Sequence, residues 1–368
     1  MDLVTSWHRA SAAVLPAGTE VWDAHTHEGQ NDPDGVIGTA PRLLEKLDEA
    51  GHRGAVLISS MEPTGYRDPN DRIRRIAADS DGRLIPYLRV DPRRGSAAVA
   101  EAERSLAKGS RGIKMHPRGE AFSVGDPVVA DIGRVAAAHG VPILFHAGRG
   151  IPALGEHVLR LLEQVEDLNV VLGHAGISDL SWIGPEAANY PGMFFDTAWW
   201  STPSILMLFA TVSPHQIVYA SDTPYGSPEM ISTIAMRAAG AAGYTEDALR
   251  AVFGGNILSL VKGERPAAVG SPAGSGIMPQ DPVVYTVYAS FHAAVTQMLR
   301  GGNPEEAVSL AKLAVRVPEN HPYAEMFDAV SATMERIDFS ADRRSKTVRP
   351  LLVASSAVLT PGQPLPVF

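Results

Sequence analysis

Short apolar runs alternate with amphipathic segments between residues 20 and 240, and this alternation constrains the fold more than any other feature. Each run has the length and the aliphatic composition of a buried strand. Eight strands are expected, at 20–24, 54–60, 83–90, 112–117, 141–148, 169–176, 193–196 and 216–222. Helices are expected after them, at 41–50, 69–79, 96–108, 128–139, 153–165, 179–188, 204–212 and 228–239. Such alternation predicts a parallel α/β fold, and eight units favour a closed (β/α)8 TIM barrel over an open sheet.

The chain changes character after the eighth unit. Residues 247–261 are expected to form two further helices that complete the barrel. Residues 264–282 are rich in Pro, Gly, Ala and Ser, which indicates a linker. We therefore predict a barrel domain at 1–263, a linker at 264–282, and a helical hairpin appendage with a tail at 283–368.

The appendage is expected to begin with an amphipathic helical pair at 283–299 and 304–315. The second helix of the pair has the small-residue spacing of a single tetratricopeptide-type hairpin. From residue 340 onwards the sequence indicates only a strand at 351–354. We expect the appendage to pack on the barrel or on another subunit.

Polar side chains stand where the predicted strands end, and the strands of such a barrel direct these ends toward one mouth. His25 and His27 are two residues apart, so in a strand they share a side and form half of a zinc-type site. A single His-x-His pair is more often satisfied by hydrogen bonds in a loop. Five of the twelve histidines at such ends, with a carboxylate at the last, indicate an active site instead. The residues concerned are His25, His27, Lys114, His116, His146, His174 and Asp222.

The composition limits how a metal could be held and what the chain could bind. There is no cysteine, which excludes thiolate ligands, disulfides and a cysteine nucleophile, so a metal would be held by His, Asp or Glu. The formal net charge of −9 argues against nucleic acid or an anionic membrane as a partner. No apolar run approaches membrane-spanning length, and the N-terminus lacks the apolar core of a signal peptide. We therefore expect a cytoplasmic protein.

Five motifs, taken in order, resemble those of the amidohydrolase superfamily. They are Asp23-Ala24-His25-Thr26-His27, Gly112-Ile113-Lys114-Met115-His116-Pro117, Phe145-His146-Ala147-Gly148, Gly173-His174-Ala175-Gly176 and Ser221-Asp222-Thr223-Pro224. The sequence looks most similar to the amidohydrolase-2 branch, which includes aminocarboxymuconate-semialdehyde decarboxylase, aromatic-acid decarboxylases and lactonases. The resemblance covers residues 18–262 and does not specify a substrate.

The resemblance implies a divalent metal held by His25, His27, His146 and Asp222, usually zinc, with manganese, iron or nickel as alternatives. Three imidazoles and one carboxylate leave room for a water, whose pKa the metal lowers. Asp222 would take the proton of that water as a general base and return it as an acid. His174 would orient the substrate or polarise its carbonyl group.

Two arrangements stay open for Lys114. In binuclear members of the superfamily a carboxylated lysine bridges two metals, and His174 would then bind the second. The Gly-x-Lys-x-His-Pro pattern is typical instead of mononuclear members, in which Lys114 and His116 face the substrate or pair with acids near the mouth. We expect a single zinc ion.

Further substrate contacts are expected from the loops around the mouth. Arg89 and Arg149 are candidates because a guanidinium fork suits a carboxylate, although solvated loop arginine is the alternative interpretation. Trp199 is expected either to wall the pocket or to cap the barrel rim. With His116, these residues are the predicted substrate-binding set.

The leading functional prediction is a metal-dependent hydrolase acting on an amide, ester or lactone. The alternative is non-oxidative decarboxylation of an aromatic or unsaturated carboxylic acid, because the same metal set serves both reactions in this branch. A non-catalytic barrel scaffold is disfavoured, since a scaffold does not need an intact ligand set. We expect a small-molecule substrate, and a homo-oligomer is compatible with the helical appendage.

Overall fold

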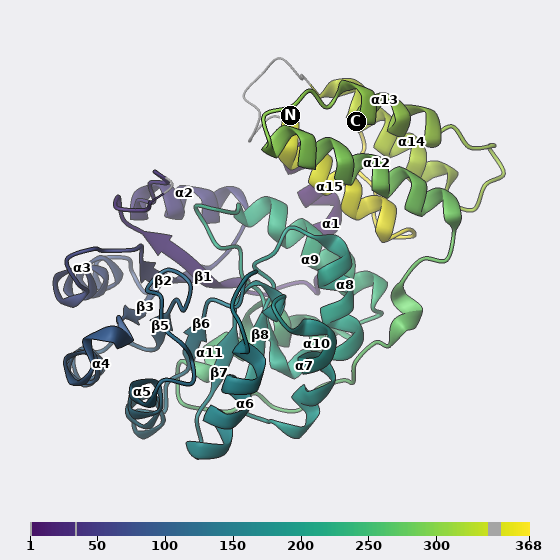
Figure 1. Ribbon diagram of the computed structural model, residues 1–368. Helices are drawn as coiled ribbons and strands as arrows, with labels where there is room; N and C mark the ends of the chain where they lie inside the picture. The colour runs from purple at the N-terminus through teal and green to yellow at the C-terminus, as the bar shows by residue number, and fades with distance from the viewer. Residues whose placement is uncertain (1, 34, 338–346) are drawn as a thin grey trace.

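The computed structural model describes residues 2–33, 35–337 and 347–368, and within them parallel strands form a closed barrel (Figure 1). β3 and β4 follow each other directly, separated only by Tyr87, and together form one stave of the barrel. The nine strands of the described residues therefore make eight staves. The barrel closes because Asp222 N donates to His25 O at 2.9 Å and His27 N donates to Thr223 O at 2.7 Å. The predicted (β/α)8 barrel is thus confirmed. The strands are β1 Trp22–Glu28, β2 Gly54–Ser59, β3 Leu84–Pro86, β4 Leu88–Arg89, β5 Ile113–Met115, β6 Ile143–Phe145, β7 Val170–Leu172, β8 Met193–Asp196 and β9 Ile217–Val218.

A ring of helices covers the outside of the barrel. Four of these helices have a proline at their first or second position, where a backbone N–H would have no partner within the helix. None of the described helices combines the length and the hydropathy needed to cross a membrane. The ring consists of α2 Ala40–Glu49, α3 Arg67–Ala78, α4 Ser96–Ala107, α5 Pro127–Ala138, α6 Leu154–Gln164, α7 Leu180–Glu186, α8 Thr202–Thr211 and α9 Pro228–Ala241, and α10 Glu246–Arg250 and α11 Asn256–Leu260 complete it.

The pleat of the strands sorts side chains into two apolar clusters. Alternate residues face opposite sides of a strand. In β6, Ile143 and Phe145 join the large cluster beneath the outer helices, whereas Leu144 joins a second cluster. Neighbouring strands contribute Val171 and Phe194 to that second cluster. Lys114 occupies the matching position of β5, between two residues of the large cluster, so the pleat directs its side chain into the barrel.

The chain begins with a helix, α1 Leu3–Ala12, that the sequence analysis did not predict. Asp2 caps this helix by accepting hydrogen bonds from two backbone N–H groups of its first turn. Trp7, on its buried face, is 0 % exposed, and its indole nitrogen donates to Thr333 Oγ1 at 3.0 Å. The first helix is therefore held by residues near the other end of the chain.

Four helices follow the barrel: α12 Pro282–Leu299, α13 Glu305–Ala314, α14 Ala324–Arg336 and α15 Arg349–Leu359. The predicted pair at 283–299 and 304–315 is confirmed as α12 and α13. Figure 1 shows this group beside α1, α8 and α9, with both chain termini close to it. The division of the chain into domains stays a prediction, and the part of the predicted tail at 338–346 lies outside the described residues.

The strand predicted at 351–354 is wrong, because these residues form the middle of α15. Every residue of this helix from Pro350 to Leu359 is buried. Its surroundings explain the burial, since α15 packs against α9 on the barrel side and against α12 and α14 on the other. A helix that is apolar all round lacks the 3.6-residue periodicity that distinguishes it from a buried strand.

A buried arginine joins the barrel to the last residues of the chain. Arg237, on α9, is 0 % exposed, and its guanidinium donates to Thr360 Oγ1 at 3.1 Å, to Thr360 O at 3.3 Å and to Pro364 O at 2.6 Å. The guanidinium also lies over the ring of Trp7, 5.2 Å from its centroid. The positive charge thus faces the carbonyl end of α15, where the helix dipole favours a cation.

Candidate metal centre and active site

Three predicted ligands converge at one point of the barrel. His27 Nε2 lies 3.1 Å from Asp222 Oδ1 and 3.1 Å from His25 Nε2, and the distance from His25 Nε2 to Asp222 Oδ1 is 3.4 Å. Period-two alternation brings the two imidazoles to one side of β1, and closure of the barrel brings Asp222 beside them. The three form a group whose ligand atoms all lie within 4.8 Å of one another, which we call the metal group.

The backbone of this region is left-handed at His174, at the adjacent Ala175 and at Asp222. Both His174 and Asp222 adopt a φ of 56°, in the left-handed region that non-glycine residues rarely occupy. Such a conformation costs about 1–3 kcal/mol and persists where the surrounding structure enforces it, often at functional sites. Here it aims both side chains toward the same end of the barrel.

Asp196, at the end of β8, fixes the orientation of His25. His25 Nδ1 donates to Asp196 Oδ2 at 2.8 Å, and both side chains are 0 % exposed. The other carboxylate oxygen accepts from His174 N at 2.7 Å and from Ala198 N at 2.9 Å. Because Nδ1 carries the proton, His25 Nε2 presents a lone pair to the metal group, as in the carboxylate–histidine pairs of metal sites. The sequence analysis gave Asp196 no role, although its place at a strand end was a usable signal.

The metal group fits a divalent ion. Burial, together with the charge of Lys114, lowers the pKa of His25 well below its ordinary value, so the ring is neutral as a ligand must be. Burial alone would raise the pKa of Asp222, but the hydrogen bond from His27 and nearby positive charge outweigh it and hold the pKa below its usual range. Nitrogen and carboxylate donors in this number suit zinc, manganese or iron. His27 differs from His25, since its Nδ1 is buried without a partner in the described part of the chain.

His146 lies beside this group and not within it. His174 Nδ1 donates to the carbonyl of Ala198 at 2.9 Å, so His174 Nε2 accepts the proton of His146 Nδ1 at 2.8 Å. The His146 ring also stacks on His116, with centroids 3.8 Å apart and an interplanar angle of 12°. Burial lowers the pKa of both stacked rings. The role of His146 as a fourth ligand stays a prediction.

Lys114 contacts the metal group directly. Its Nζ lies 2.8 Å from His25 Nε2, and the side chain is 1 % exposed. Burial lowers the pKa of Lys114 to about 8, although the negative charge of Asp222 acts in the opposite direction. Lys114 is therefore a buried residue of this site.

A cavity of about 470 Å³ opens above the metal group. Its size falls in the range of about 300–1,000 Å³ that is usual for small-molecule sites. Tyr225 and Asp32, which the sequence analysis did not predict as site residues, also line the cavity. The Tyr225 hydroxyl donates to Asp32 Oδ2 at 2.5 Å. Its other polar lining residues are His25, His27, Arg89, Lys114, His116, Arg118, His146 and Asp222.

Arg89 lines the cavity, but several N–H groups of its guanidinium already donate hydrogen bonds within the protein. Its Nε and Nη2 both donate to Glu120 Oε1, at 2.9 and 2.6 Å, and both side chains are 3 % exposed. Glu120 Oε1 also accepts from the Tyr66 hydroxyl at 2.6 Å, and Oε2 accepts from His116 N at 3.1 Å. No sequence signal marked Glu120, which lies in the loop after β5. Arg89 is thus oriented by a buried carboxylate.

Two predicted contact residues lie outside the lining of this cavity. The Arg149 guanidinium lies over the Trp199 ring, 5.5 Å from its centroid. Trp199 is half-buried and packs edge-on to His174, with centroids 6.1 Å apart. Their predicted part in substrate binding would require the substrate to extend toward the loop after β6.

The fold and the metal group define a metal-dependent barrel enzyme. Residues 22–262 match the amidohydrolase family of the second type, so the chain belongs to the amidohydrolase-2 family, as the motifs predicted. No curated protein matches the sequence at a significant level.

Solved structures with the same fold include several decarboxylases. The 5-carboxyvanillate decarboxylase from Sphingomonas paucimobilis is 15% identical, with a TM-score of 0.52 over 67% of this chain and 99% of that one. The 2,6-dihydroxybenzoate decarboxylase from Rhizobium is 13% identical, with a TM-score of 0.54 over 66% and 99%. The 5-carboxyvanillate decarboxylase from Novosphingobium aromaticivorans, complexed with manganese, is 15% identical, with a TM-score of 0.53 over 67% and 98%. At these identities the likeness concerns the fold.

Proposed function

We propose that the chain is a metal-dependent enzyme that removes the carboxylate of a small organic acid as CO2. The observation that carries this proposal is the lining of the cavity, where Lys114, Arg89 and Arg118 lie around the same space as the metal group. Cationic side chains there favour an anionic substrate over a neutral one. The decarboxylases among the structures with this fold support the same reaction class.

His25, His27 and Asp222 would hold the metal, with His146 as the predicted fourth ligand. A divalent ion in that position supplies Lewis acidity, which polarises oxygen atoms and lowers the pKa of water. Zinc is the predicted metal and manganese the alternative that the Novosphingobium structure supports.

The residues of the chain would bind the acid and move one proton. When the carbon–carbon bond breaks, CO2 leaves, its electron pair stays on the substrate carbon, and a proton must bond there. Asp222 is ionised, since its pKa lies below the ordinary value despite burial, so it can accept a proton from a substrate hydroxyl or from water and pass it on. Lys114 and Arg118 would orient the anion.

Hydrolysis of an amide, ester or lactone is the second candidate. Asp222 favours it, because an ionised carboxylate within the metal group can deprotonate an attacking water and then protonate the leaving group. Both candidates take a small-molecule substrate. A cytoplasmic location and a homo-oligomeric state stay predictions.

One panel separates the two reactions. The purified chain, loaded with zinc and separately with manganese, would be incubated with aromatic and unsaturated carboxylic acids, and with lactones, esters and amides. Release of CO2 and release of new acid would be followed independently, with Asp222→Asn as the control for contaminating enzymes. We expect CO2 from one or more carboxylic acids. Acid release without CO2 would replace decarboxylation by hydrolysis, and inactivity toward both groups would contradict the proposal.

A further inference from the structure

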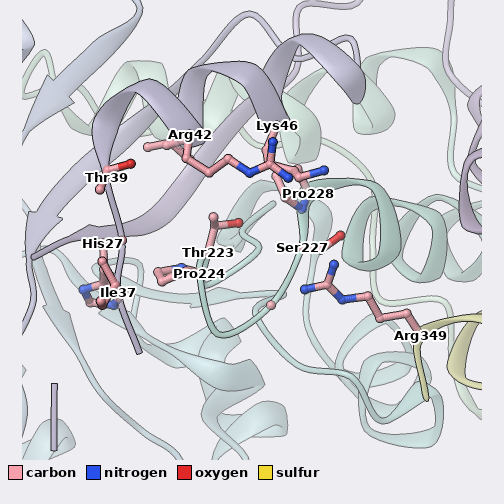
Figure 2. Close-up of a pocket in the computed structure, with 13 residues that line it drawn as sticks. His27, Ile37, Thr39, Arg42, Lys46, Thr223, Pro224, Ser227, Pro228 and Arg349 are labelled. Carbon is pink, nitrogen blue, oxygen red and sulfur yellow. The ribbon is translucent and has the colours of Figure 1, made fainter. Parts of the chain in front are cut away.

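A second cavity, of about 180 Å³, lies between α2, the loop before α9 and the first residue of α15 (Figure 2). His27 lines both this cavity and the larger one. The volume well exceeds the roughly 10–15 Å³ that one water requires, yet it is smaller than a site for a drug-sized ligand. It suits one small molecule.

The charges around this cavity are of one sign. Arg42, Lys46 and Arg349 line it, and none of its described lining residues is acidic. Figure 2 shows Arg42 and Lys46 extending from α2 along one side and Arg349 reaching in from the opposite side. Arg42 and Lys46 belong to α2 and Arg349 to α15, so the three come together only in the folded chain. Three cations lining a space without a lining carboxylate favour an anion in it.

The backbone adds to this field. Thr39, the residue before α2, and Ser227 and Pro228, at the start of α9, all line the cavity, so two helices begin at its wall. The N-terminus of a helix carries a partial positive charge of about half an elementary unit. Thr39 makes no capping hydrogen bond with its side chain, which leaves its hydroxyl available to a ligand.

Arg42 and Lys46 each pair with a glutamate of the same helix. Arg42 pairs with Glu45 and Lys46 with Glu49, and these pairs lie at least partly in solvent. Exposed pairs of this kind contribute little, about 0–1 kcal/mol by double-mutant cycles, so they do not prevent an exchange of partners. Arginine has five donors and lysine three, which leaves donors for a second anion.

We propose that this cavity binds a small oxyanion, such as inorganic phosphate or the phosphate or carboxylate group of a small metabolite. The occupant would contact α2, α9 and α15 together, and would thereby join the barrel to its C-terminal helices. The proposal does not depend on the reaction that the metal group performs.

Binding of inorganic phosphate to the full-length chain tests it. Isothermal titration at constant ionic strength would compare the natural sequence with the double variant Arg42→Gln/Lys46→Gln. We expect saturable binding that the double variant weakens roughly tenfold or more, since hydrogen bonds to charged groups are lost. Arg160→Gln is the matched control, because Arg160 is similarly exposed and also pairs with a glutamate on its own helix. The charge-conserving Arg42→Lys/Lys46→Arg variant should recover most of the affinity.

Phosphate could instead bind a metal ion at the metal group, so each titration would be repeated on chelator-treated protein. Unchanged binding after metal removal supports the basic cavity. Binding that disappears with the metal, equal affinity in the double variant, or no saturable binding would each overturn the proposal. Acetate in place of phosphate distinguishes a carboxylate site from a phosphate site, and either result is consistent with a small oxyanion.

Discussion

Lys114 Nζ lies 2.8 Å from His25 Nε2 and donates its proton to the nitrogen that a metal would bind. The His25 tautomer is set from its other side by Asp196, so this lone pair is available to one partner at a time. The amine and a metal ion therefore compete for the same nitrogen. Removing the amine tests whether Lys114 bridges two metals or lies beside a single one.

Lys114→Met should leave one ion per chain and bind it as tightly as the natural sequence or more tightly. The substitution removes both a competing donor and a positive charge beside the cation. Metal affinity would be measured by competition with a chromophoric chelator, and the ion count by elemental analysis. A natural chain with two ions that falls to one in this variant would instead establish Lys114 as a carboxylated bridge.

Asp196→Asn should weaken metal binding by about 10–100-fold, the usual effect of losing the carboxylate behind a histidine ligand. The amide accepts the His25 proton less strongly and can present N–H in place of oxygen. Chelator competition at neutral pH measures the change. Asp131→Asn, an exposed carboxylate on α5, is the control, and equal affinities in the two variants would contradict the orienting role.

Asp222→Asn and His25→Ala should separate chemistry from metal binding. The amide keeps one ligating oxygen, so metal content should fall modestly, while the chemical step loses about 10²–10⁴-fold through loss of the base. His25→Ala should lose metal and activity together. Ion content and turnover would be measured on the same preparations, and near-full activity of Asp222→Asn would leave this residue as a ligand at most.

Acid should destabilise the fold through His52. This ring is 4 % exposed, and neither of its nitrogens has a partner in the described residues. Burial, with a contribution from His8, lowers its pKa from 6.5 to about 3. The unfolded chain therefore binds the extra proton, and unfolding free energy is lost as the pH falls from about 6.5 toward 3, by about 1.4 kcal/mol per pH unit.

Urea unfolding at pH 7.5, 6.0 and 5.0 measures this dependence. In His52→Phe the loss between pH 6.0 and 5.0 should be smaller than in the natural chain by about one proton's contribution. Profiles that run parallel would show that His52 does not titrate differently in the folded and unfolded states.

Arg237→Ala should lower the free energy of unfolding by about 2–4 kcal/mol, because two backbone carbonyls near the C-terminus lose their donor. Residues 360–368 should also become sensitive to proteases before the rest of the chain. Urea unfolding and timed proteolysis measure the two effects. Arg134→Ala, an exposed arginine of α5, should change neither. An undisturbed tail in Arg237→Ala would refute the tether.

The barrel was predictable because its signal is local. Each predicted strand is a short apolar run bounded by turn residues, and the candidate ligands His25, His27 and Asp222 follow or end such runs. The two-residue spacing predicts that His25 and His27 lie on one side of a strand. The common direction of the strands predicts that Asp222 lies at the same end of the barrel.

What the sequence did not reveal depends on contacts between distant segments. The partnership of His25 with Asp196 spans 171 residues, and that of Arg89 with Glu120 spans 31. The helix α15 was mistaken for a strand because layers on both sides bury it, which removes the polar face that identifies a helix. The position of His146 beside His174 likewise follows from side-chain packing, which no motif encodes.

The hydrogen bond between Trp7 and Thr333 joins residues 326 positions apart. A ribosome that adds about 5–20 residues per second takes about 16–65 s to travel from one to the other. During that interval the indole lacks its hydrogen-bond acceptor, and α1 can pack only against the barrel, chiefly against α9. The strand that carries His25 and His27, and the loop after β9 that carries Asp222, have been completed well before the interval ends. Translation therefore delivers the whole barrel, with its candidate metal ligands, before it delivers α14, which supplies the hydrogen-bond acceptor for Trp7.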